Sequence, residues 1–249
     1  MVVVDLVPMV TSRKSISLGL DLKKPLKIEG FNYIRRNGRF TKAQKSAYEN
    51  LYSKYRADLG RLSNLKRPFG LEIGFGMGAQ FVEWACSVPD AWHIIGVELY
   101  KPGIGAMLSK ADKLGLSNLS FIDQPIQAFL SDIAPEGIDE VRIFFPDPWP
   151  KKKHAKRRLI NTEFVDELSK KMAAGASLSI ATDWEQYALE ITSIFDASSA
   201  FILKEDAANN PSPIQEAGGG YSGQTKFEAR GIRLGHSIWH LAYTKTKKI

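Results

Sequence analysis

Short apolar runs alternate with stretches of helical periodicity from Phe69 to about residue 195. Because parallel strands need long crossover connections, which are usually helices, this alternation predicts a doubly wound α/β fold with a mostly parallel sheet. The predicted strands cover residues 70–74, 93–98, 119–122, 141–145 and 177–182. The helical patterns lie near residues 79–88, 103–114, 125–132, 161–173 and 184–195.

Both ends of the chain differ from this alternating region. The apolar runs 201–204 and 238–243 flank a loop rich in Gly, Pro and Asn, and we expect them to close the sheet as an antiparallel edge hairpin. The first forty residues lack sustained periodicity and predict an extended basic arm, followed by a helix that begins after Thr41. The predicted organisation is a basic N-terminal arm and helix, residues 1–65, and an α/β domain, residues 66–249.

The net charge of +7 is unevenly distributed along the chain. Residues 1–70 carry 15 Lys and Arg against 5 Asp and Glu, and the octet 151–158 carries six cationic side chains. Residues 226–249 carry a net +5, whereas residues 71–150 and 159–225 each carry a net −7. Basic segments that bracket an acidic core are typical of a polyanion-binding surface on a folded domain.

The composition excludes several classes of protein. A single cysteine, Cys86, excludes an internal disulfide framework and a Cys-rich zinc site, and we expect no bound metal. No apolar run reaches the roughly 18 residues of a membrane-spanning helix. The first ten residues lack the basic start of a signal peptide and contain Asp5, so we expect a cytoplasmic protein.

A glycine-rich turn joins the first predicted strand to the first predicted helix. Glycines at Gly74, Gly76 and Gly78 let a ligand approach the backbone closely. Glu72 precedes them, and Glu98 ends the second strand, where nucleotide-binding folds hold ribose hydroxyls. NAD fits the glycine spacing, but S-adenosylmethionine fits better, because a nearby carboxylate can oppose its positive charges.

An acidic residue between two prolines follows the fourth predicted strand. The segment reads FFPDPWP and continues directly into KKKHAKRR. Ligands bind beyond the carboxyl ends of strands in open α/β sheets, so we expect Asp147 beside the cofactor. Its carboxylate can accept hydrogen bonds from guanine N1–H and the guanine amino group, and the cations that follow can neutralise phosphates.

Taken together, these segments resemble those of the bacterial single-subunit tRNA (guanine-N7-)-methyltransferases. The matching stretches extend over residues 35–243 in the same order and include LEIGFGMGAQF, FFPDPWPKKKHAKRRL, ATDW and TKFEARGIRLGHSIWHL. The resemblance implies a Rossmann-like methyltransferase that moves a methyl group from S-adenosylmethionine to N7 of the variable-loop guanine of tRNA. We expect a monomer or a homodimer that needs no separate protein partner.

The resemblance also assigns roles by motif match. Asp147 is implied to be the central active-site carboxylate and a cofactor contact. The other implied cofactor contacts include Glu72, Glu98 and the glycines of the turn. The implied contacts to the substrate nucleotide are Lys151, Asp183, Thr225, Lys226, Phe227 and Glu228. The basic loop is expected to bind RNA through Lys152, Lys153, His154, Lys156, Arg157 and Arg158.

Two positions depart from the family's pattern. Pro125 stands where the family carries an Asp or Asn that reads the adenine of the cofactor, and proline has neither a side-chain donor nor a backbone N–H. Asp123 and Gln124 are the candidates to replace this contact. His240 stands where the family's pattern has an Asp.

The predicted reaction requires alignment rather than proton transfer. Guanine N7 has a free lone pair in the plane of the ring, so we predict no general base, although His154 and His236 are available. Two other hypotheses stay open. A nicotinamide-dependent dehydrogenase would need a substrate domain that this length does not supply, and an RNA-binding scaffold without activity is favoured only by Pro125.

Overall fold

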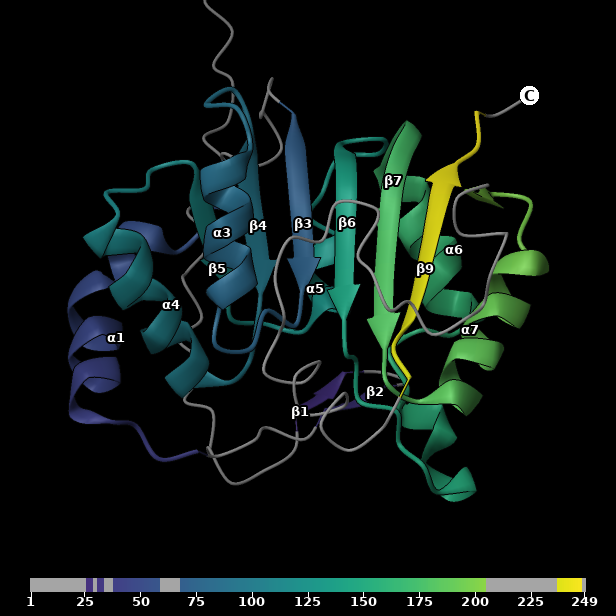
Figure 1. The fold of residues 1–249 in the computed structure, drawn as a ribbon, viewed down its shortest axis with the longest axis horizontal. Helices are drawn as coiled ribbons and strands as arrows, with labels where there is room; N and C mark the ends of the chain where they lie inside the picture. The colour runs from purple at the N-terminus through teal and green to yellow at the C-terminus, as the bar shows by residue number, and fades with distance from the viewer. Residues whose placement is uncertain (1–25, 29–30, 34–37, 59–67, 205–236, 248–249) are drawn as a thin grey trace, which may run out of the picture.

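The computed structural model describes residues 26–28, 31–33, 38–58, 68–204 and 237–247. Seven strands form one sheet in the order β5-β4-β3-β6-β7-β9-β8 (Figure 1). Their bounds are β3 (Phe69–Ile73), β4 (His93–Val97), β5 (Leu119–Ile122), β6 (Ile138–Phe144), β7 (Met172–Thr182), β8 (Phe201–Leu203) and β9 (Trp239–Lys245). The five neighbouring strands β5, β4, β3, β6 and β7 are parallel to one another. Strand β9 runs antiparallel to both β7 and β8.

Helices cover both faces of this sheet (Figure 1). One apolar cluster lies under the helices of each face. One face carries α1 (Lys42–Tyr55), α3 (Ala79–Ser87) and α4 (Lys101–Lys113). The other carries α5 (Ile126–Leu130), α6 (Thr162–Lys171) and α7 (Glu185–Asp196). The predicted doubly wound α/β fold is therefore confirmed. The predicted edge hairpin is confirmed too, with the later strand β9 placed inside and β8 at the edge.

The predicted boundaries differ from the structure chiefly where a helix runs into a strand. The periodicity extends a helix to residue 173 and starts the next strand at 177, whereas α6 ends at Lys171 and β7 begins at Met172 without a loop. Gly175 adopts a φ of +83° in the added part of β7, a conformation that side chains disfavour. A strand that starts so abruptly carries no separate turn signal for sequence reasoning to detect.

The segment interpreted as an extended arm contains a short hairpin. Strands β1 (Leu26–Ile28) and β2 (Phe31–Tyr33) pair antiparallel. In Figure 1 this hairpin lies beyond the carboxyl ends of the parallel strands, and β2 contacts the 3-10 helix η1 (Lys152–Arg157). Strands of three residues are too short to show a repeating pattern, so the sequence could not predict them.

Helix α1 packs on the sheet domain rather than away from it. Thr41 caps the helix as predicted: its hydroxyl accepts from the Gln44 N–H, and the Gln44 side chain accepts from the Thr41 N–H. Tyr55 is buried in the same apolar cluster as α3 and α4. Just after the helix, the Ala57 N–H donates to the Phe121 carbonyl of β5 at 2.9 Å, so the chain covers the exposed edge of β5.

Gly105→Ala is expected to destabilise the protein by about 1–3 kcal/mol through overpacking between α1 and α4. A Cβ at this position would stand 2.3 Å from the Gln44 carbonyl oxygen, so the two helices would have to separate. The gain in helix propensity, roughly 1 kcal/mol, does not compensate for backbone overlap of this size. Urea unfolding measures the change, and Ser109→Ala on the same helix is the control. An unchanged midpoint would show that the contact is not tight in solution.

Candidate active site

The glycine turn between β3 and α3 has a backbone that only glycine adopts easily. Gly74, Gly76 and Gly78 have φ values of +82°, +56° and +70°. A Cβ added at Gly74 or Gly76 would meet no described atom within 4 Å, so this backbone borders open space. On the opposite side, the Gly76 carbonyl lies so close to Gly103 of α4 that a Cβ there would stand 2.1 Å away. The turn therefore packs against α4 through the Gly76 carbonyl, and beside Gly74 and Gly76 it leaves the space that a bound ligand requires.

Glu98 connects the two loops at this edge of the sheet. One carboxylate oxygen accepts from the Gly76 N–H at 2.7 Å, and the other accepts from the N–H groups of Leu99 and Tyr100 at 2.7 and 2.9 Å. The carboxylate, predicted as a cofactor contact, thus also holds the glycine turn against the start of α4. Charge-assisted bonds of this kind are stronger than neutral ones.

Glu72 is the buried carboxylate of the site. It is only 4% exposed on β3, and its Oε2 atom has no hydrogen-bond partner among the described residues. Burial, with a smaller contribution from the Glu98 charge, raises the pKa of Glu72 to about 8, although Arg142 acts in the opposite direction. A buried acceptor without a partner is costly, and a cationic donor beside it would offset that cost. The chemistry at Glu72 therefore fits the ammonium and sulfonium charges of S-adenosylmethionine.

We expect S-adenosylhomocysteine to bind more tightly as the pH rises from 6 towards 8 and to displace a proton from Glu72. If no ionisable group such as Glu72 contacted the ligand, binding would neither depend on pH in this way nor release a proton. Without ligand, ionisation of Glu72 favours the unfolded chain, so its contribution to stability decreases as the pH rises from 4.5 towards 8. Calorimetry in two buffers of different ionisation enthalpy measures the proton release. Glu72→Gln should abolish the release, and Glu163→Gln on exposed α6 should not. Release that persists in Glu72→Gln would contradict the assignment.

Asp123 lies at the end of β5, two residues before Pro125, and α1 contacts it. The Tyr52 hydroxyl donates to Asp123 Oδ2 at 2.9 Å, and Arg56 Nε lies 3.9 Å from Oδ1. Burial, followed by the Asp123 charge, raises the pKa of Tyr52 well above its usual range, so the hydroxyl stays a donor at neutral pH. Pro125 is the N-cap of α5, and its carbonyl accepts from the N–H groups of Ala128 and Phe129.

The segment that carries Asp147 has an unusual backbone at both ends. Phe145 and Trp149 have φ values of +50° and +41°, which cost about 1 kcal/mol or more each for residues other than glycine. The Phe145 N–H donates to the Ala181 carbonyl of β7 at 2.7 Å, which anchors the start of the segment. The side chain of Asp147 is exposed to solvent. Since β6 lies between β3 and β7, this segment stands next to the glycine turn.

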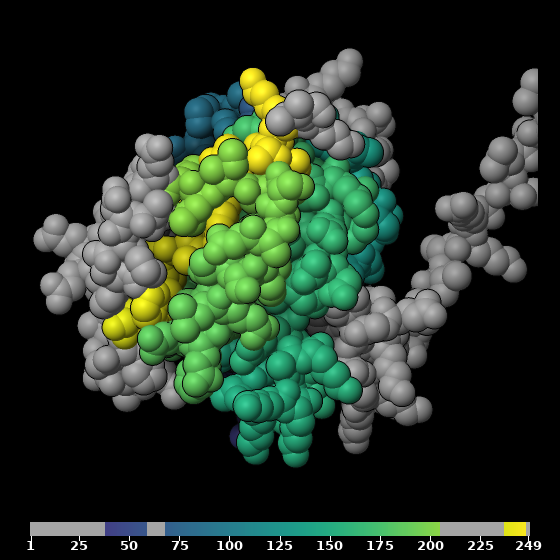
Figure 2. Space-filling view, turned by 90° about the vertical axis from the view of Figure 1, so that its right-hand side faces the viewer, coloured from purple at the N-terminus to yellow at the C-terminus, as the bar shows by residue number. Residues whose placement is uncertain are grey.

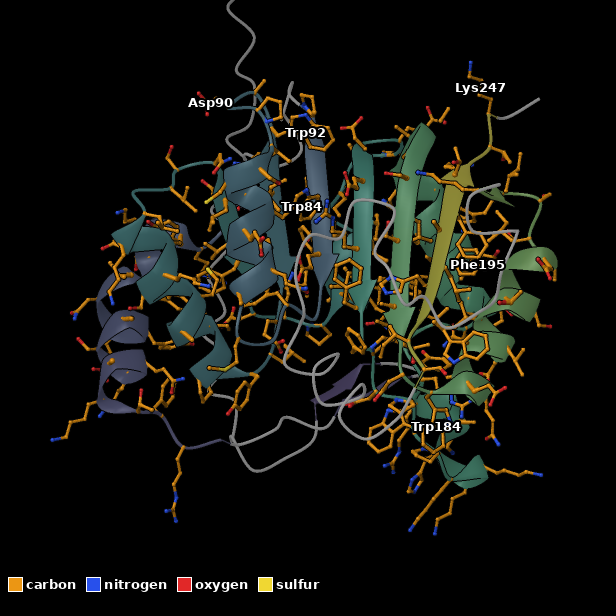
Figure 3. All side chains as sticks on the ribbon, in the orientation of Figure 1. Trp84, Asp90, Trp92, Trp184, Phe195 and Lys247 are labelled. Carbon is orange, nitrogen blue, oxygen red and sulfur yellow. The ribbon has the colours of Figure 1, made fainter. Side chains whose placement is uncertain are left out.

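Asp183 lies beyond the carboxyl end of β7, the strand next to β6, and so has a position similar to that of Asp147. It directly follows β7, as the Asp147 segment follows β6, and the two strands pair in parallel with Phe144 opposite Ala181. Trp184, labelled in Figure 3, comes next and is the N-cap of α7 at the same edge of the sheet. The structure therefore places Glu72, Glu98, Asp123, Gln124, Asp147 and Asp183 on or just after five adjacent parallel strands.

The six central residues of the basic octet form the 3-10 helix η1, where sequence reasoning predicted a loop, and Lys151 and Arg158 are its caps. It protrudes at the lower end of the molecule in Figures 1 and 2. Lys151, Lys152, Lys153 and Lys156 are exposed. The His154 ring meets the Trp149 ring edge-on at 5.7 Å, and Arg157 lies over the same Trp149 ring at 5.0 Å. Slight desolvation, followed by the charges of Arg157 and Lys153, lowers the pKa of His154, so at neutral pH the ring adds no charge to η1.

Arg158 differs from the other cations of the octet because it points inward. It is 8% exposed, and its guanidinium pairs with Glu190 of α7. In this structure Arg158 is thus held by the protein itself, whereas the sequence pattern grouped it with the cations expected to contact RNA. Sequence reasoning missed this role because nothing in KKKHAKRR distinguishes Arg158 from Arg157.

Other predicted positions lie elsewhere. Thr225, Lys226, Phe227, Glu228 and His236 lie outside the described residues. His240 sits in β9 opposite Ala181 of β7. Within the described part of the chain, no three His, Cys, Asp or Glu side chains form a group that could hold a metal ion. In the same part, no helix is long and apolar enough to cross a membrane.

The parallel sheet with one reversed strand, the glycine turn and the acidic carboxyl edge together define a Rossmann-like methyltransferase. The fold is similar to that of a 16S rRNA (adenine(1408)-N(1))-methyltransferase from Catenulisporales acidiphilia, with a TM-score of 0.50 and 15% identity over 78% of this chain and 93% of that one. The 16S rRNA methyltransferase KamB matches equally well, with a TM-score of 0.50 and 15% identity over 86% of this chain and 97% of the other.

Sequence comparison identifies the family. Residues 66–241 match a family model described as "Putative methyltransferase". The chain is 37% identical to the tRNA (guanine-N(7)-)-methyltransferase of Photobacterium profundum over 87% of its own length and 89% of that protein. It is 39% identical to the Nitrosomonas eutropha protein of the same name, over 86% and 96% of the two chains. The chain belongs to the tRNA (guanine-N(7)-)-methyltransferase family, an enzyme family whose methyl donor is S-adenosylmethionine, as its sequence predicted.

Proposed function

We propose that this enzyme transfers a methyl group from S-adenosylmethionine to N7 of the variable-loop guanine of tRNA. One observation carries the proposal: Asp147 stands on a strained, anchored segment between the buried Glu72 and the exposed cations of η1. The Oε2 atom of Glu72 has no hydrogen-bond partner within the described part of the chain. That arrangement suits a cationic cofactor, a base with hydrogen-bond donors on one edge, and a phosphate backbone, in that order along the carboxyl edge of the sheet.

When bound, S-adenosylmethionine supplies an electrophilic methyl group on a sulfonium centre. The chain's own residues orient the nucleophile. We propose that Asp147 accepts hydrogen bonds from guanine N1–H and the amino group, which aims N7 towards the glycine turn. Methylation leaves a positive charge on the base, and the carboxylates of Asp147 and Asp183 stabilise it as it develops. No proton leaves N7, so the proposed mechanism contains no general base.

The remaining site residues are proposed by motif match and position. Glu72, Glu98, Asp147 and the glycine turn would hold the cofactor, with Asp123 or Gln124 near its adenine. Lys151, Asp183 and the run from Thr225 to Glu228 would contact the substrate nucleotide. The exposed residues of η1 would bind tRNA phosphates.

We also propose that residues 66–249 form the methyltransferase domain and that residues 1–65 add the basic arm and α1. Both the cofactor turn and the candidate base-binding segment come from one chain, which supports a monomer or homodimer without an obligate partner subunit. A tRNA substrate supports a cytoplasmic location.

The direct test uses unmodified tRNA transcripts and labelled S-adenosylmethionine. Nucleoside analysis should find the label in 7-methylguanosine, and a transcript with adenosine at the variable-loop guanine should stay unlabelled. Label in another nucleoside would refute the proposed function. Thermal stabilisation by NAD but not by S-adenosylhomocysteine would instead favour a dehydrogenase.

A further inference from the structure

Arg158 links the segment that carries Asp147 to helix α7. Its Nε donates to the Pro148 carbonyl at 2.8 Å, while its terminal nitrogen Nη1 pairs with Glu190. Pro148 is the residue directly after Asp147. Arg158 is 8% exposed, so its end of both interactions is shielded from water, whereas the Glu190 side chain is 38% exposed. A single side chain therefore connects the segment that carries Asp147 to helix α7.

The prolines of this segment do not by themselves fix the orientation of the Pro148 carbonyl. The proline rings fix φ at Pro146 and Pro148, but ψ of Pro148 can still rotate and would swing its carbonyl. The next residue, Trp149, adopts a φ of +41°, which it does not favour by itself. A donor on the Pro148 carbonyl holds the peptide plane that joins these two residues. Arg158 thus supplies a restraint that the two prolines do not.

A second contact ties the other end of the basic segment to the same helix. The hydroxyl of Tyr187, which is fully buried in α7, accepts from the Ile160 N–H at 3.1 Å. The guanidinium of Arg158 lies over the Tyr187 ring at 5.0 Å. Tyr187 and Glu190 are three residues apart and so lie on one face of α7. Together they hold the chain on both sides of η1, before it at Pro148 and after it at Ile160.

We propose that Arg158 and Glu190 are positioning residues for Asp147, acting through the Pro148 carbonyl. The proposal rests on the proposed function, because Asp147 is taken to hold the target guanine. Arg158 does not add to the charge that binds tRNA. Its bonds to Pro148 and Glu190 keep Asp147 in a defined direction, while the cations of η1, a few residues later, remain exposed to solvent. A small displacement of a group that aligns reactants is expected to reduce the rate more than the affinity.

The test is Glu190→Gln, a change in a side chain that is 38% exposed and so can be made without opening the core. We expect kcat for 7-methylguanosine formation to fall about tenfold. The KM for S-adenosylmethionine, the Kd for tRNA and its salt dependence should stay at the wild-type values. Glu167→Gln is the matched control, because Glu167 pairs with Lys170 on the surface of α6. That variant should keep the wild-type kcat.

A second variant separates positioning from RNA binding. Arg158→Lys keeps the positive charge but loses the planar fork that reaches Pro148 and Glu190 together. We expect the same loss of kcat as in Glu190→Gln, and no further loss in the double variant. Tighter tRNA binding with a steeper salt dependence in Glu190→Gln would show that a released Arg158 binds phosphate, and would overturn the proposal. A wild-type kcat in either folded variant would also overturn it.

The two proposals fail in different ways. If the wild-type enzyme forms no 7-methylguanosine, the proposed function is wrong and the positioning role is wrong with it. If the wild type is active and Asp147→Asn is not, while Glu190→Gln and Arg158→Lys both match the wild type, only the positioning role is refuted.

Discussion

Asp147→Asn is expected to lower kcat/KM for tRNA methylation by about 10²–10³-fold while the protein stays folded. The amide keeps the size of the side chain but removes the negative charge that accepts from the guanine edge and stabilises the cationic product. Asp147 is exposed, so the change disturbs no packing. Initial rates of 7-methylguanosine formation measure the loss, and the melting temperature with S-adenosylhomocysteine reports folding and cofactor binding.

Asp90→Asn provides the matched control for that prediction. Asp90 is also exposed, but it lies in the turn before β4, at the edge of the sheet opposite to Trp184 (Figure 3). Both variants remove one acidic charge from the surface, and only one of them should change the rate. An Asp147→Asn enzyme with a wild-type rate would exclude Asp147 from the reaction.

Replacing Lys151, Lys152 and Lys153 together by Ala is expected to weaken tRNA binding about a hundredfold at physiological salt. Each phosphate contact contributes roughly 0.7–0.9 to the slope of log affinity against log salt concentration, so the slope should decrease by about two to three. All three side chains are exposed on or beside η1. Titrations of labelled tRNA at several salt concentrations give both quantities.

The control for this triple variant removes the same charge from another part of the surface. Lys110, Lys113 and Lys170 are exposed near the C-terminal ends of α4 and α6. Those ends lead into β5 and β7, so they lie at the amino edge of the sheet, away from the site. An equal decrease in slope for both triple variants would mean that tRNA responds to net charge rather than to η1.

The strands at the centre of the sheet could be predicted because short runs of apolar residues must be buried, and few positions in an α/β fold other than a central strand bury such a run. Leu119–Ile122 has the predicted bounds, β4 ends one residue earlier than predicted, and β3 begins and ends one residue earlier. The order along the sheet also follows from general rules, since right-handed crossovers leave few options. The acidic groups were predictable for the same reason, because each lies within a predicted strand or within two residues of its end.

Long-range partners of individual side chains could not be predicted. Arg157 and Arg158 are neighbours of the same type, yet one lies over the Trp149 ring and the other pairs with Glu190, 32 positions further along. The Tyr52 hydroxyl reaches Asp123 across 71 positions of sequence. Periodicity shows which face of an element is apolar, but it does not show which distant polar group that face will meet.

The position of β9 has a consequence for the order in which the chain can fold during synthesis. β7 exposes its outer edge until residues 239–245 pair with it, and β8 has no place in the sheet before that strand arrives. Because the ribosome releases the N-terminal part first, the sheet remains open along β7 until residues 239–245 have emerged. An unpaired edge of this length invites pairing with other chains. The pairing of β9 with β7 is therefore the step that protects this edge of the nascent sheet from aggregation.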